Sequence, residues 1–330
     1  MTTPDRLPRL LPLIPQYRER VWGGQRLHPS TTGTPTGEAW IAYGKSVVSA
    51  GAMQGQTLDQ LMALDQLLEG ARAELLGERG AAQAASEAGF PLLVKLLDCA
   101  DWLSVQVHPN DEQARQMVGP GMLGKTEAWH LLEAAPDAQI LAGVKAGTTQ
   151  ETLEQAIRGG TVLEVAERHG VAAGDTVFIP AGTLHALGPG LLLYEVQQSS
   201  DTTYRVYDWD RPASSGRALH LQESVAVTRA ELRGDIRPES QTHGQGELTA
   251  CEYFVLRGLH LDSGAAQDAD TGGQSFQIVT VTSGQAEVST GDERVLLDTF
   301  GTLLVTGGAG AYRLKAVGGP ARLLMAGLPG

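Results

Sequence analysis

The stretch GDTVFIPAGTLHALG, residues 174–188, contains the pattern that decides the fold. Its first part, TVFI, is rich in β-branched and aromatic side chains and predicts a short strand. Pro180 and Gly182 follow at once and are typical of a tight turn that sends the chain back. We therefore expect His185 to begin the return strand and its imidazole to point into the interior of the fold.

Turn residues and short strands also dominate the rest of the chain. The 330 residues include 41 glycines, which favours many tight turns over a helical bundle. Apolar and polar residues alternate from Leu103 to His108, and this period of two predicts a strand with one polar face. We expect residues 126–136 and 138–145 to form a hairpin. The sequence as a whole predicts a mainly β protein.

Two helical insertions interrupt these strands. Leucines recur at helical spacing after Thr57, which is a plausible N-cap, and Gly77 is a plausible stop, so we expect helices within residues 57–88. A capping box that begins at Thr148 predicts a second helical insertion over residues 148–169.

A change in composition near residue 230 predicts a domain boundary. Beyond a polar, Gly-containing linker, short strands recur at regular spacing, which predicts a sandwich or jelly roll. We therefore divide the chain into residues 1–230 and 231–330. GDTVFIPAG at 174–182 and GTLLVTGG at 301–308 share one pattern of glycine, strand and turn, which suggests that the two β units are related copies.

Composition excludes several classes of protein. Acidic residues (38) outnumber basic ones (25), giving a formal charge of −13, so a dedicated nucleic-acid binder is excluded. Cys99 and Cys251 stand far apart, which argues against a disulfide framework or a thiolate metal site. The N-terminal stretch does not resemble a signal peptide, and the apolar run at 90–97 is too short to span a bilayer. We expect a cytoplasmic protein without a membrane partner.

Gln106 and His108 are the first candidate functional residues. They lie two positions apart on a predicted strand, so both side chains leave the same face. An imidazole and an amide oxygen that point into one cavity form half of a metal site. A polar strand face by itself is more often only solvated, and the inward-pointing His185 is what strengthens the metal hypothesis.

The Pro-x-Gly turn before His185 resembles the second motif of the cupin superfamily, whose jelly-roll barrels hold one metal ion with His and carboxylate ligands. The usual first cupin motif is His-x-His, whereas this chain has Gln106-x-His108. Five more fragments complete the comparison: RVWGG (20–24), GEAWIAYG (37–44), LSVQVHPND (103–111), GKTEAWH (124–130) and YEVQQSSDTTYRVYDWDR (194–211). Together they resemble type I mannose-6-phosphate isomerases, also called phosphomannose isomerases, of the short bacterial form.

This resemblance covers roughly residues 8–225 and implies a fold. It implies two cupin-like jelly-roll barrels or sandwiches, with helical additions to the N-terminal one. The C-terminal unit lacks a His/Glu cluster, so we expect it to be a metal-free β domain.

The resemblance also implies one zinc ion per chain, held by four side chains: Gln106, His108, Glu127 and His185. Two imidazoles, a carboxylate and an amide oxygen suit Zn²⁺, and Fe²⁺, Mn²⁺ and Co²⁺ are compatible as well. Gln106 has an alternative role, in which it hydrogen-bonds a ligand instead of the metal. His130 lies three residues after Glu127, hence on the opposite strand face, and we exclude it.

The reaction implied is interconversion of mannose 6-phosphate and fructose 6-phosphate through an enediol(ate). Matched to the family, Arg205 contacts either an enediolate oxygen or the substrate phosphate. Lys125 either binds substrate or moves a proton between its oxygens. Glu195 is either a base or an ion-pair partner that holds Arg205. Despite the acidic surface, we expect a locally cationic pocket for an anionic sugar.

Two other functions fit such a barrel. A cupin metallo-oxygenase uses a similar metal site, although iron oxygenases favour more histidine ligands than this chain offers. A non-catalytic sugar-binding cupin would retain the barrel without the reaction. The basic residues Lys125 and Arg205 favour the isomerase over both alternatives.

Overall fold

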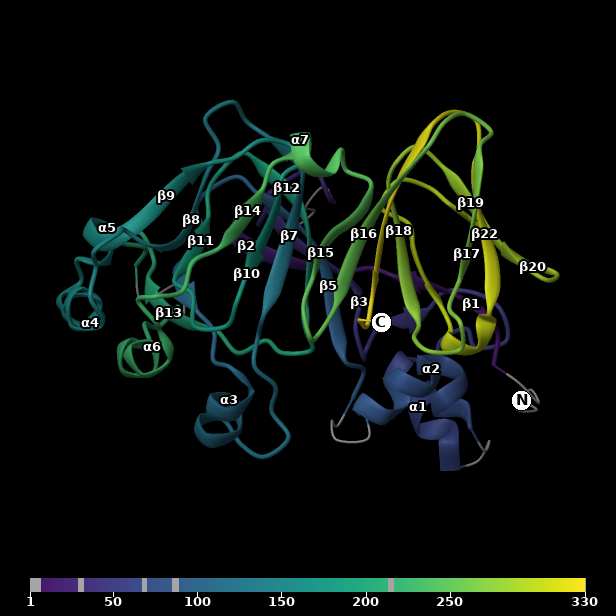
Figure 1. Cartoon of the computed structure of the whole chain (residues 1–330), viewed down its shortest axis with the longest axis horizontal. Helices are drawn as coiled ribbons and strands as arrows, with labels where there is room; N and C mark the ends of the chain where they lie inside the picture. The colour runs from purple at the N-terminus through teal and green to yellow at the C-terminus, as the bar shows by residue number, and fades with distance from the viewer. Residues whose placement is uncertain (1–6, 29–32, 67–69, 85–88, 213–216, 330) are drawn as a thin grey trace. The chain divides into compact units, whose positions relative to one another are not determined.

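Strands dominate the protein, which confirms the prediction of a mainly β fold with two jelly-roll-like sandwiches (Figure 1). The computed structural model describes residues 7–28, 33–66, 70–84, 89–212 and 217–329. Backbone contacts divide the chain into two units. Unit 1 comprises residues 1–16, 40–95 and 242–330, and unit 2 comprises residues 17–39 and 96–241.

The strands of unit 2 form two antiparallel sheets. One has the order β14-β10-β7-β12-β5-β2-β3 and the other the order β13-β6-β11-β8-β9. The bounds in the first sheet are β14 Asp235–Arg237, β10 Thr176–Ile179, β7 Glu127–Ala134, β12 Leu191–Gln198, β5 Leu92–Cys99, β2 Gln16–Gly24 and β3 Thr36–Ala42. Those in the second are β13 Tyr204–Tyr207, β6 Val105–Val107, β11 His185–Leu187, β8 Gln139–Val144 and β9 Ala166–Gly170.

One apolar core lies between these two sheets. Trp129 and Leu131 of β7 face Ile140 and Ala142 of β8 and Leu187 of β11. Each strand contributes every second side chain to this core, because successive side chains leave opposite faces of a strand. The alternate positions of the β13–β9 sheet are therefore free to pack elsewhere.

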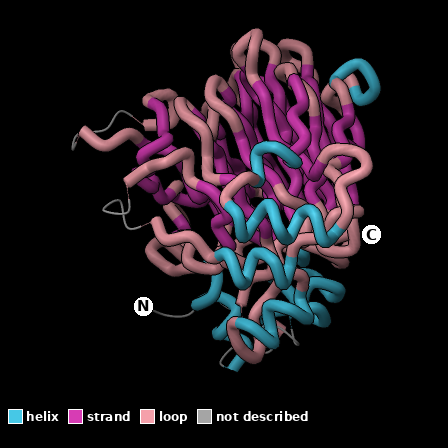
Figure 2. The backbone as a smooth tube through the Cα atoms, turned by 90° about the vertical axis from the view of Figure 1, so that its left-hand side faces the viewer, coloured by secondary structure: helices cyan, strands magenta, loops and turns pink. Residues whose placement is uncertain are grey.

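Helices cover that other face of the β13–β9 sheet, as the view in Figure 2 shows from the side of α4 and α6. The α-helices of unit 2 are α3 Asp111–Met117, α4 Gln150–Gly159, α5 Val162–Val165 and α6 Leu221–Val227, and the short α7 Glu239–Thr242 lies at its end. Leu153 and Ile157 of α4 and Val225 of α6 pack with Val105 and Leu141 of the sheet. The Thr149 side chain caps α4 by accepting from Thr152 N, and Gly160 ends it in the left-handed region at φ 73°.

The capping box expected to begin at Thr148 does not form, because the N-cap of α4 is Thr149. Two other predictions about this region are also wrong. The helical insertion does not reach residue 169, because the chain becomes extended at Ala166 and continues as β9, which pairs with the edge of β8. The hairpin of residues 126–136 and 138–145 does not form either. Instead, β7 pairs with β10 and β12, while β8 pairs with β9 and β11. Both errors concern long-range strand pairing, which local periodicity does not specify.

Unit 1 also contains two sheets, with the orders β15-β16-β23-β18-β21-β1-β4 and β17-β22-β19-β20. Their bounds are β15 Gly246–Ala250, β16 Val255–Leu261, β23 Ala321–Gly327, β18 Gln277–Ser283, β21 Thr302–Val305, β1 Leu10–Ile14, β4 Val47–Val48, β17 Ala266–Asp270, β22 Ala311–Ala316, β19 Ala286–Thr290 and β20 Glu293–Leu297. Val279, Val281 and Leu323 of the first sheet pack against Val288 and Leu314 of the second.

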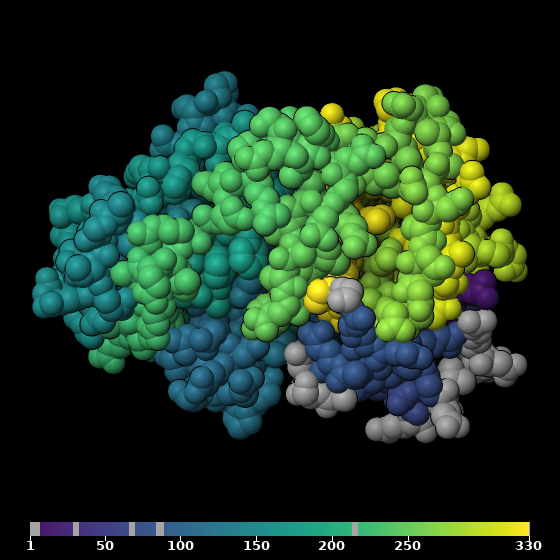
Figure 3. Space-filling view, in the orientation of Figure 1, coloured from purple at the N-terminus to yellow at the C-terminus, as the bar shows by residue number. Residues whose placement is uncertain are grey.

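Two helices, α1 Leu58–Ala63 and α2 Ala71–Ala84, account for the first predicted insertion, and residues 67–69 and 85–88 of that prediction lie outside the described residues. Thr57 caps α1 as expected. Gly77 has non-helical dihedrals (φ 78°, ψ 167°), so it ends the first helical stretch as expected, and a second stretch continues to Ala84 under the same label. A Cβ at Gly77 would clash with the backbone of Gln274. Glu78 N donates to Gly273 O at 2.9 Å, so α2 (blue in Figure 3) lies against the C-terminal part of the chain.

The contact-based units therefore differ from the predicted boundary at residue 230. β1, β4, α1 and α2 come early in the sequence but group with the C-terminal strands. Contacts do not report independent folding, so the division into residues 1–230 and 231–330 stays a prediction. Within the described ranges, every helix is too short or too polar to cross a bilayer. Both cysteines are free thiols.

Candidate metal centre

Strand register brings three of the expected site residues into one row. In the β13–β9 sheet, His185 lies opposite Gln106, and Gln106 lies opposite Arg205. Directly opposed residues share a sheet face, so all three side chains leave the side that faces the other sheet of unit 2. Val105 and Val107 point the other way and pack under the helices.

The carboxylate of Glu127 meets this row from the facing sheet. Glu127 is the first residue of β7 and is fully buried. Its Oε2 lies 3.5 Å from His108 Nε2, and its Oε1 lies 3.4 Å from His185 Nε2. One ligand atom from each of these three residues lies within 4.8 Å of the others. Three of the four expected metal ligands therefore converge on one point.

Backbone carbonyls orient both imidazoles toward that point. His108 Nδ1 lies 2.9 Å from Thr202 O, and His185 Nδ1 lies 2.8 Å from Thr183 O. A carbonyl oxygen only accepts hydrogen bonds, so Nδ1 carries the proton in each ring. The lone pair of Nε2 is left to point at the centre, which is the form that binds a metal ion.

The donor atoms at the centre lack hydrogen-bond partners. Within the described residues, His108 Nε2 and both carboxylate oxygens of Glu127 are buried and accept no hydrogen bond. Lys125 Nζ approaches Glu127 Oε2 to 2.9 Å and forms an ion pair with it. Buried polar atoms normally find partners, so a cluster of unused lone pairs fits a bound cation.

Burial and charge hold these groups in their metal-binding protonation states. Burial, together with the nearby Lys125 cation, lowers the pKa of His108 to about 3. Burial also lowers the pKa of His185. Burial alone would raise the pKa of Glu127, but Lys125 and the two imidazoles hold it well below its usual range. Neutral imidazoles and an ionised carboxylate are the forms that ligate metals.

Gln106 reaches the centre through its amide nitrogen. Its Nε2 lies 3.3 Å from His185 Nε2, and its Oε1 accepts from Ser104 Oγ at 3.2 Å. In this arrangement the amide donates to the same lone pair that a metal ion would take. A half-turn of the amide would place Oε1 there instead, and the two orientations have nearly the same shape. The geometry thus accommodates Gln106 in either of its expected roles.

Lys125 is held beside Glu127 by a network that sequence reasoning missed. Gln198 Oε1 accepts from Thr126 N at 3.0 Å, and Gln198 Nε2 donates to Asp111 Oδ1 at 2.8 Å. The same Asp111 oxygen accepts from Gly124 N at 2.7 Å. These bonds clamp the backbone on both sides of Lys125. No local pattern could reveal them, because the partners are far apart in sequence.

Glu195 lies on the same face as Glu127, one pair deeper into the sandwich. It is opposite Trp129 in the β7–β12 pairing, and Trp129 Nε1 donates to Glu195 Oε2 at 3.2 Å. The Trp129 ring also meets the His185 ring edge-on, with centroids 5.7 Å apart. Trp129 therefore links the candidate base to a candidate ligand, a role that its apolar character alone had not suggested.

Arg205 is half-buried at the other end of the row. Its Nη1 donates to Ala218 O at 2.9 Å. Burial and the nearby Arg217 lower its pKa, although Asp208 opposes the shift. Within the described residues no ion pair joins Arg205 to Glu195, so the expected alternative in which Glu195 holds Arg205 has no such contact here.

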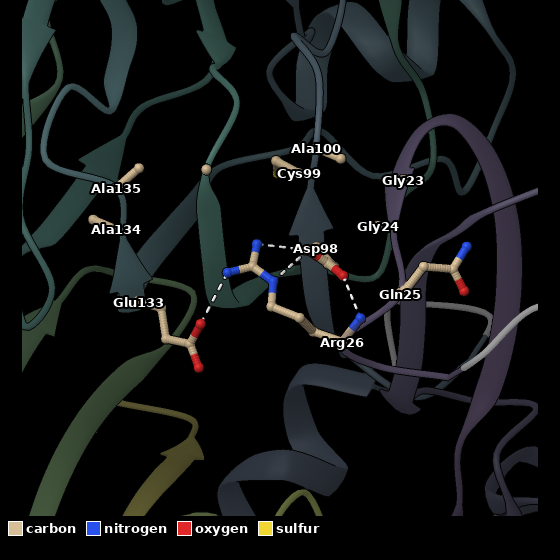
Figure 4. A pocket seen from close by; sticks show the side chains of 11 residues that line it. Gly23, Gly24, Gln25, Arg26, Asp98, Cys99, Ala100, Glu133, Ala134 and Ala135 are labelled. Carbon is tan, nitrogen blue, oxygen red and sulfur yellow. Dashed lines mark hydrogen bonds and ion pairs between the residues drawn. The ribbon is translucent and has the colours of Figure 1, made fainter.

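Two other features do not belong to the centre. His130 Nδ1 bonds Thr176 Oγ1 at 3.0 Å on the opposite face of β7, which agrees with its exclusion. A pocket of ≈ 660 Å³ lies at the far end of the same strands, where β7 ends and β12 begins (Figure 4). The Arg26 guanidinium there is already paired with Asp98 and Glu133 (Figure 4). That pocket is a structural ion-pair site rather than the metal centre.

Comparisons with known proteins identify the family of this chain. The family described as phosphomannose isomerase type I, catalytic domain, matches residues 10–137. The mannose-6-phosphate isomerase ManA of Bacillus subtilis (strain 168) is 36% identical over 318 residues, which cover 91% of this chain and 94% of that protein. A mannose-6-phosphate isomerase of Streptococcus mutans is 36% identical and covers 86% of this chain and 87% of its own length.

The solved structures extend the likeness to the whole fold. The crystal structure of the mannose 6-phosphate isomerase from Bacillus subtilis matches with a TM-score of 0.78 at 28% identity, covering 97% of this chain and 99% of that chain. The likeness therefore spans both β units and not only the part that carries the metal centre.

Proposed function

Because the chain belongs to the type I mannose-6-phosphate isomerase family, we propose that it interconverts mannose 6-phosphate and fructose 6-phosphate with the help of one divalent metal ion, zinc. The observation that carries the metal proposal is the buried cluster of His108, Glu127 and His185, in which His108 Nε2 and both Glu127 oxygens lack hydrogen-bond partners. A mixed set of imidazole and carboxylate ligands without thiolates suits Zn²⁺.

These three side chains would hold the ion, and Gln106 would add an amide oxygen after a half-turn of its amide. Bound zinc supplies a Lewis acid that stabilises negative charge developing on a substrate oxygen. Thr183 and Thr202 contribute through their carbonyls, which keep both imidazoles in the tautomer that leaves Nε2 free.

The remaining residues act on the substrate itself. Aldose–ketose isomerisation moves a proton between C2 and C1, and the intermediate enediol(ate) carries negative charge on oxygen. Lys125 and Arg205 bring two cations to a site that must accept both this charge and a phosphate. In our proposal Glu195 takes the proton, and its hydrogen bond from Trp129 fixes which oxygen faces the substrate.

The test is a coupled assay that follows fructose 6-phosphate formed from mannose 6-phosphate. Turnover should disappear when a chelator removes the metal and return when Zn²⁺ is added back. Glu127→Gln removes the charged ligand and should abolish both turnover and bound metal. Full turnover in protein shown by elemental analysis to be metal-free would overturn the metal proposal.

Glu133→Gln is the matched control. Glu133 lies on the same strand as Glu127, but its carboxylate is exposed and ion-paired with Arg26 at the far end of β7. The same chemical change should there leave turnover and metal content unaltered. If both variants lose activity equally, the effect is not specific to the metal centre.

A further inference from the structure

The two β units have the same strand topology. In unit 2, β12 lies between β7 and β5, β11 lies between β6 and β8, and β10 pairs with β7. In unit 1, β23 lies between β18 and β16, β22 lies between β17 and β19, and β21 pairs with β18. Strands β5–β12 thus correspond one to one with β16–β23, which extends the short sequence likeness of residues 174–182 and 301–308 to eight strands.

Register then shows which residues occupy equivalent positions. Glu127, the first residue of β7, lies opposite Ile179, the last residue of β10. Gln277, the first residue of β18, lies opposite Val305, the last residue of β21, in the same way. Gln277 therefore occupies the position of the metal-binding carboxylate.

The histidine positions have counterparts too. Gln106 pairs with His185, and the corresponding strands pair Ala269 with Tyr312. Of the five β17–β22 pairs we select this one because the Tyr312 side chain reaches Gln277, as His185 reaches Glu127 in the other unit. On that ground Tyr312 takes the place of His185. Thr271 follows Ala269 by two residues, as His108 follows Gln106. None of these replacements is a good metal ligand, which explains why this unit lacks a metal centre in the described residues.

A cavity nevertheless persists at this position. It measures ≈ 210 Å³, and its lining includes Thr271, Gln277 and Met325. The hydroxyl of Tyr312, which is buried, donates to Gln277 Oε1 and lies 3.9 Å from Met325 Sδ. Unit 2 has the cluster of His108, Glu127 and His185 at this position. Unit 1 instead has the Gln277 amide and the Tyr312 phenol, which hydrogen-bond each other beside the cavity.

Two arginines give this cavity a positive charge. Arg257 lies opposite Met325 in the β16–β23 pairing, so it shares the face that lines the cavity. Its guanidinium has no ion pair or hydrogen bond within the described part of the chain. Burial raises the pKa of Tyr312, and the charge of Arg257 opposes that rise.

Arg79 reaches the cavity from α2. Its backbone N donates to Gln274 O at 3.0 Å, and its Nη1 donates to Pro329 O, so both ends of the residue are anchored. One carboxylate, Asp270, also lines the cavity, and its Oδ1 accepts from Gly272 N at 2.7 Å. Among the described residues that line the cavity, two cations and one anion give a net positive charge.

We propose that this cavity is a second ligand site, in which Arg79 and Arg257 bind the phosphate group of a small phosphorylated molecule. Arginine forks match the geometry of phosphate oxygens and form strong, charge-assisted hydrogen bonds with them. Pockets for drug-sized ligands measure about 300–1,000 Å³, so this smaller cavity suits a compact ligand. Gln277 and Thr271 are already hydrogen-bonded to Tyr312 and Gly307, so they form the polar wall of the cavity, and the two arginines carry the proposed binding.

The experiment is isothermal titration of the intact, metal-loaded enzyme with inorganic phosphate at low ionic strength. Arg257→Gln should weaken binding to the cavity by at least about tenfold. Asp270→Asn removes a repulsive charge and should strengthen the same binding. Opposite effects of two neighbouring substitutions are not produced by a general loss of structure.

Two further variants separate this site from the catalytic centre. Arg205→Ala alters the metal-bearing unit and should leave the phosphate binding that depends on Arg257 intact. Arg322 lies at the other end of β23, so Arg322→Gln is the matched arginine control and should leave the affinity for phosphate unchanged. Arg257→Gln should also retain turnover of mannose 6-phosphate. Phosphate binding that is unchanged in Arg257→Gln and in Arg79→Gln, or absent from the wild-type enzyme, would overturn the proposal.

Discussion

Replacing Lys125 with methionine removes the cation from the ion pair inside the candidate metal centre. The Lys125 side chain is 4% exposed and that of Glu127 is 1% exposed, and Nζ lies 2.9 Å from Oε2. Methionine is similar in length to the lysine stem and should fill the space without a large cavity. The main effect of Lys125→Met is therefore to leave the Glu127 carboxylate buried without its partner.

The expected loss of stability follows from that burial. Removal of one partner from a buried ion pair typically costs about 3–5 kcal/mol, because the other charge remains desolvated. For a unit of 150–250 residues this corresponds to a fall in Tm of about 6–20 °C. A metal ion would replace the missing cation, and at 100 times its Kd it would return about 2.7 kcal/mol. The metal-free variant should thus be clearly less stable than the metal-free wild type, and Zn²⁺ at that concentration should recover about 2.7 kcal/mol of the difference.

The assay is thermal unfolding followed by circular dichroism, with and without Zn²⁺, after treatment with a chelator. Lys145→Met is the matched control, because Lys145 is exposed and its Nζ only donates to Glu164 O at 2.7 Å. This control should shift stability by less than about 1 kcal/mol. The proposed ion pair and metal site are refuted if metal-free Lys125→Met unfolds at the wild-type temperature, or if Zn²⁺ does not raise the unfolding temperature of the variant.

Three more predictions concern the same site. In the metal-free protein the folded-state pKa values of His108 and Glu127 lie below their unfolded values, so the unfolded chain takes up protons first as the pH falls. The stability they contribute is complete above about pH 6.5 and should decline toward pH 3 in urea unfolding. Trp129→Phe keeps the ring but loses the bond to Glu195, and kcat should fall about tenfold while bound zinc, measured by elemental analysis, stays constant. Arg205→Ala should lower kcat by about 10²–10³ in the coupled assay, with circular dichroism unchanged.

A specific result would contradict each of these three predictions. A flat stability profile between pH 6.5 and 4 would show that His108 is not held neutral in the metal-free protein. Loss of zinc from Trp129→Phe would assign that residue to the metal and not to Glu195. A change in KM alone for Arg205→Ala would assign Arg205 to uniform substrate binding instead of transition-state stabilisation.

Much of the fold and part of the site could be predicted from local pattern. The alternation from Leu103 to His108 placed Gln106 and His108 on one face, and the turn at Pro180 and Gly182 placed His185 on a returning strand. Such inferences succeed because the direction of a side chain on a strand depends only on its position in the alternation. Which strands pair with each other was harder to predict, and the expected hairpin of residues 126–136 and 138–145 was wrong.

Helix ends and groupings also required the three-dimensional structure. Val162–Val165 is helical but Ala166 turns into a strand, because an open edge of β8 is available to pair with it. Likewise the helix is interrupted at Gly77, as the sequence predicted, but only the folded structure shows that the kink packs against the backbone near Gln274 and that a second helical stretch follows. These outcomes depend on what a segment meets after folding, which its own residues do not encode.

By itself, the sequence determined the chemical types at the site: two imidazoles, a carboxylate, an amide and two cations at spacings that set their strand faces. Only the tertiary structure decided which nitrogen each imidazole offers, and it placed the Gln106 amide beside His185. It alone linked Trp129 to Glu195 and revealed a charged hollow at the equivalent place in unit 1. The reason is physical: side-chain direction is a local property of the backbone, whereas hydrogen-bond partners and cavities come from segments that are distant in sequence and meet only in the folded chain.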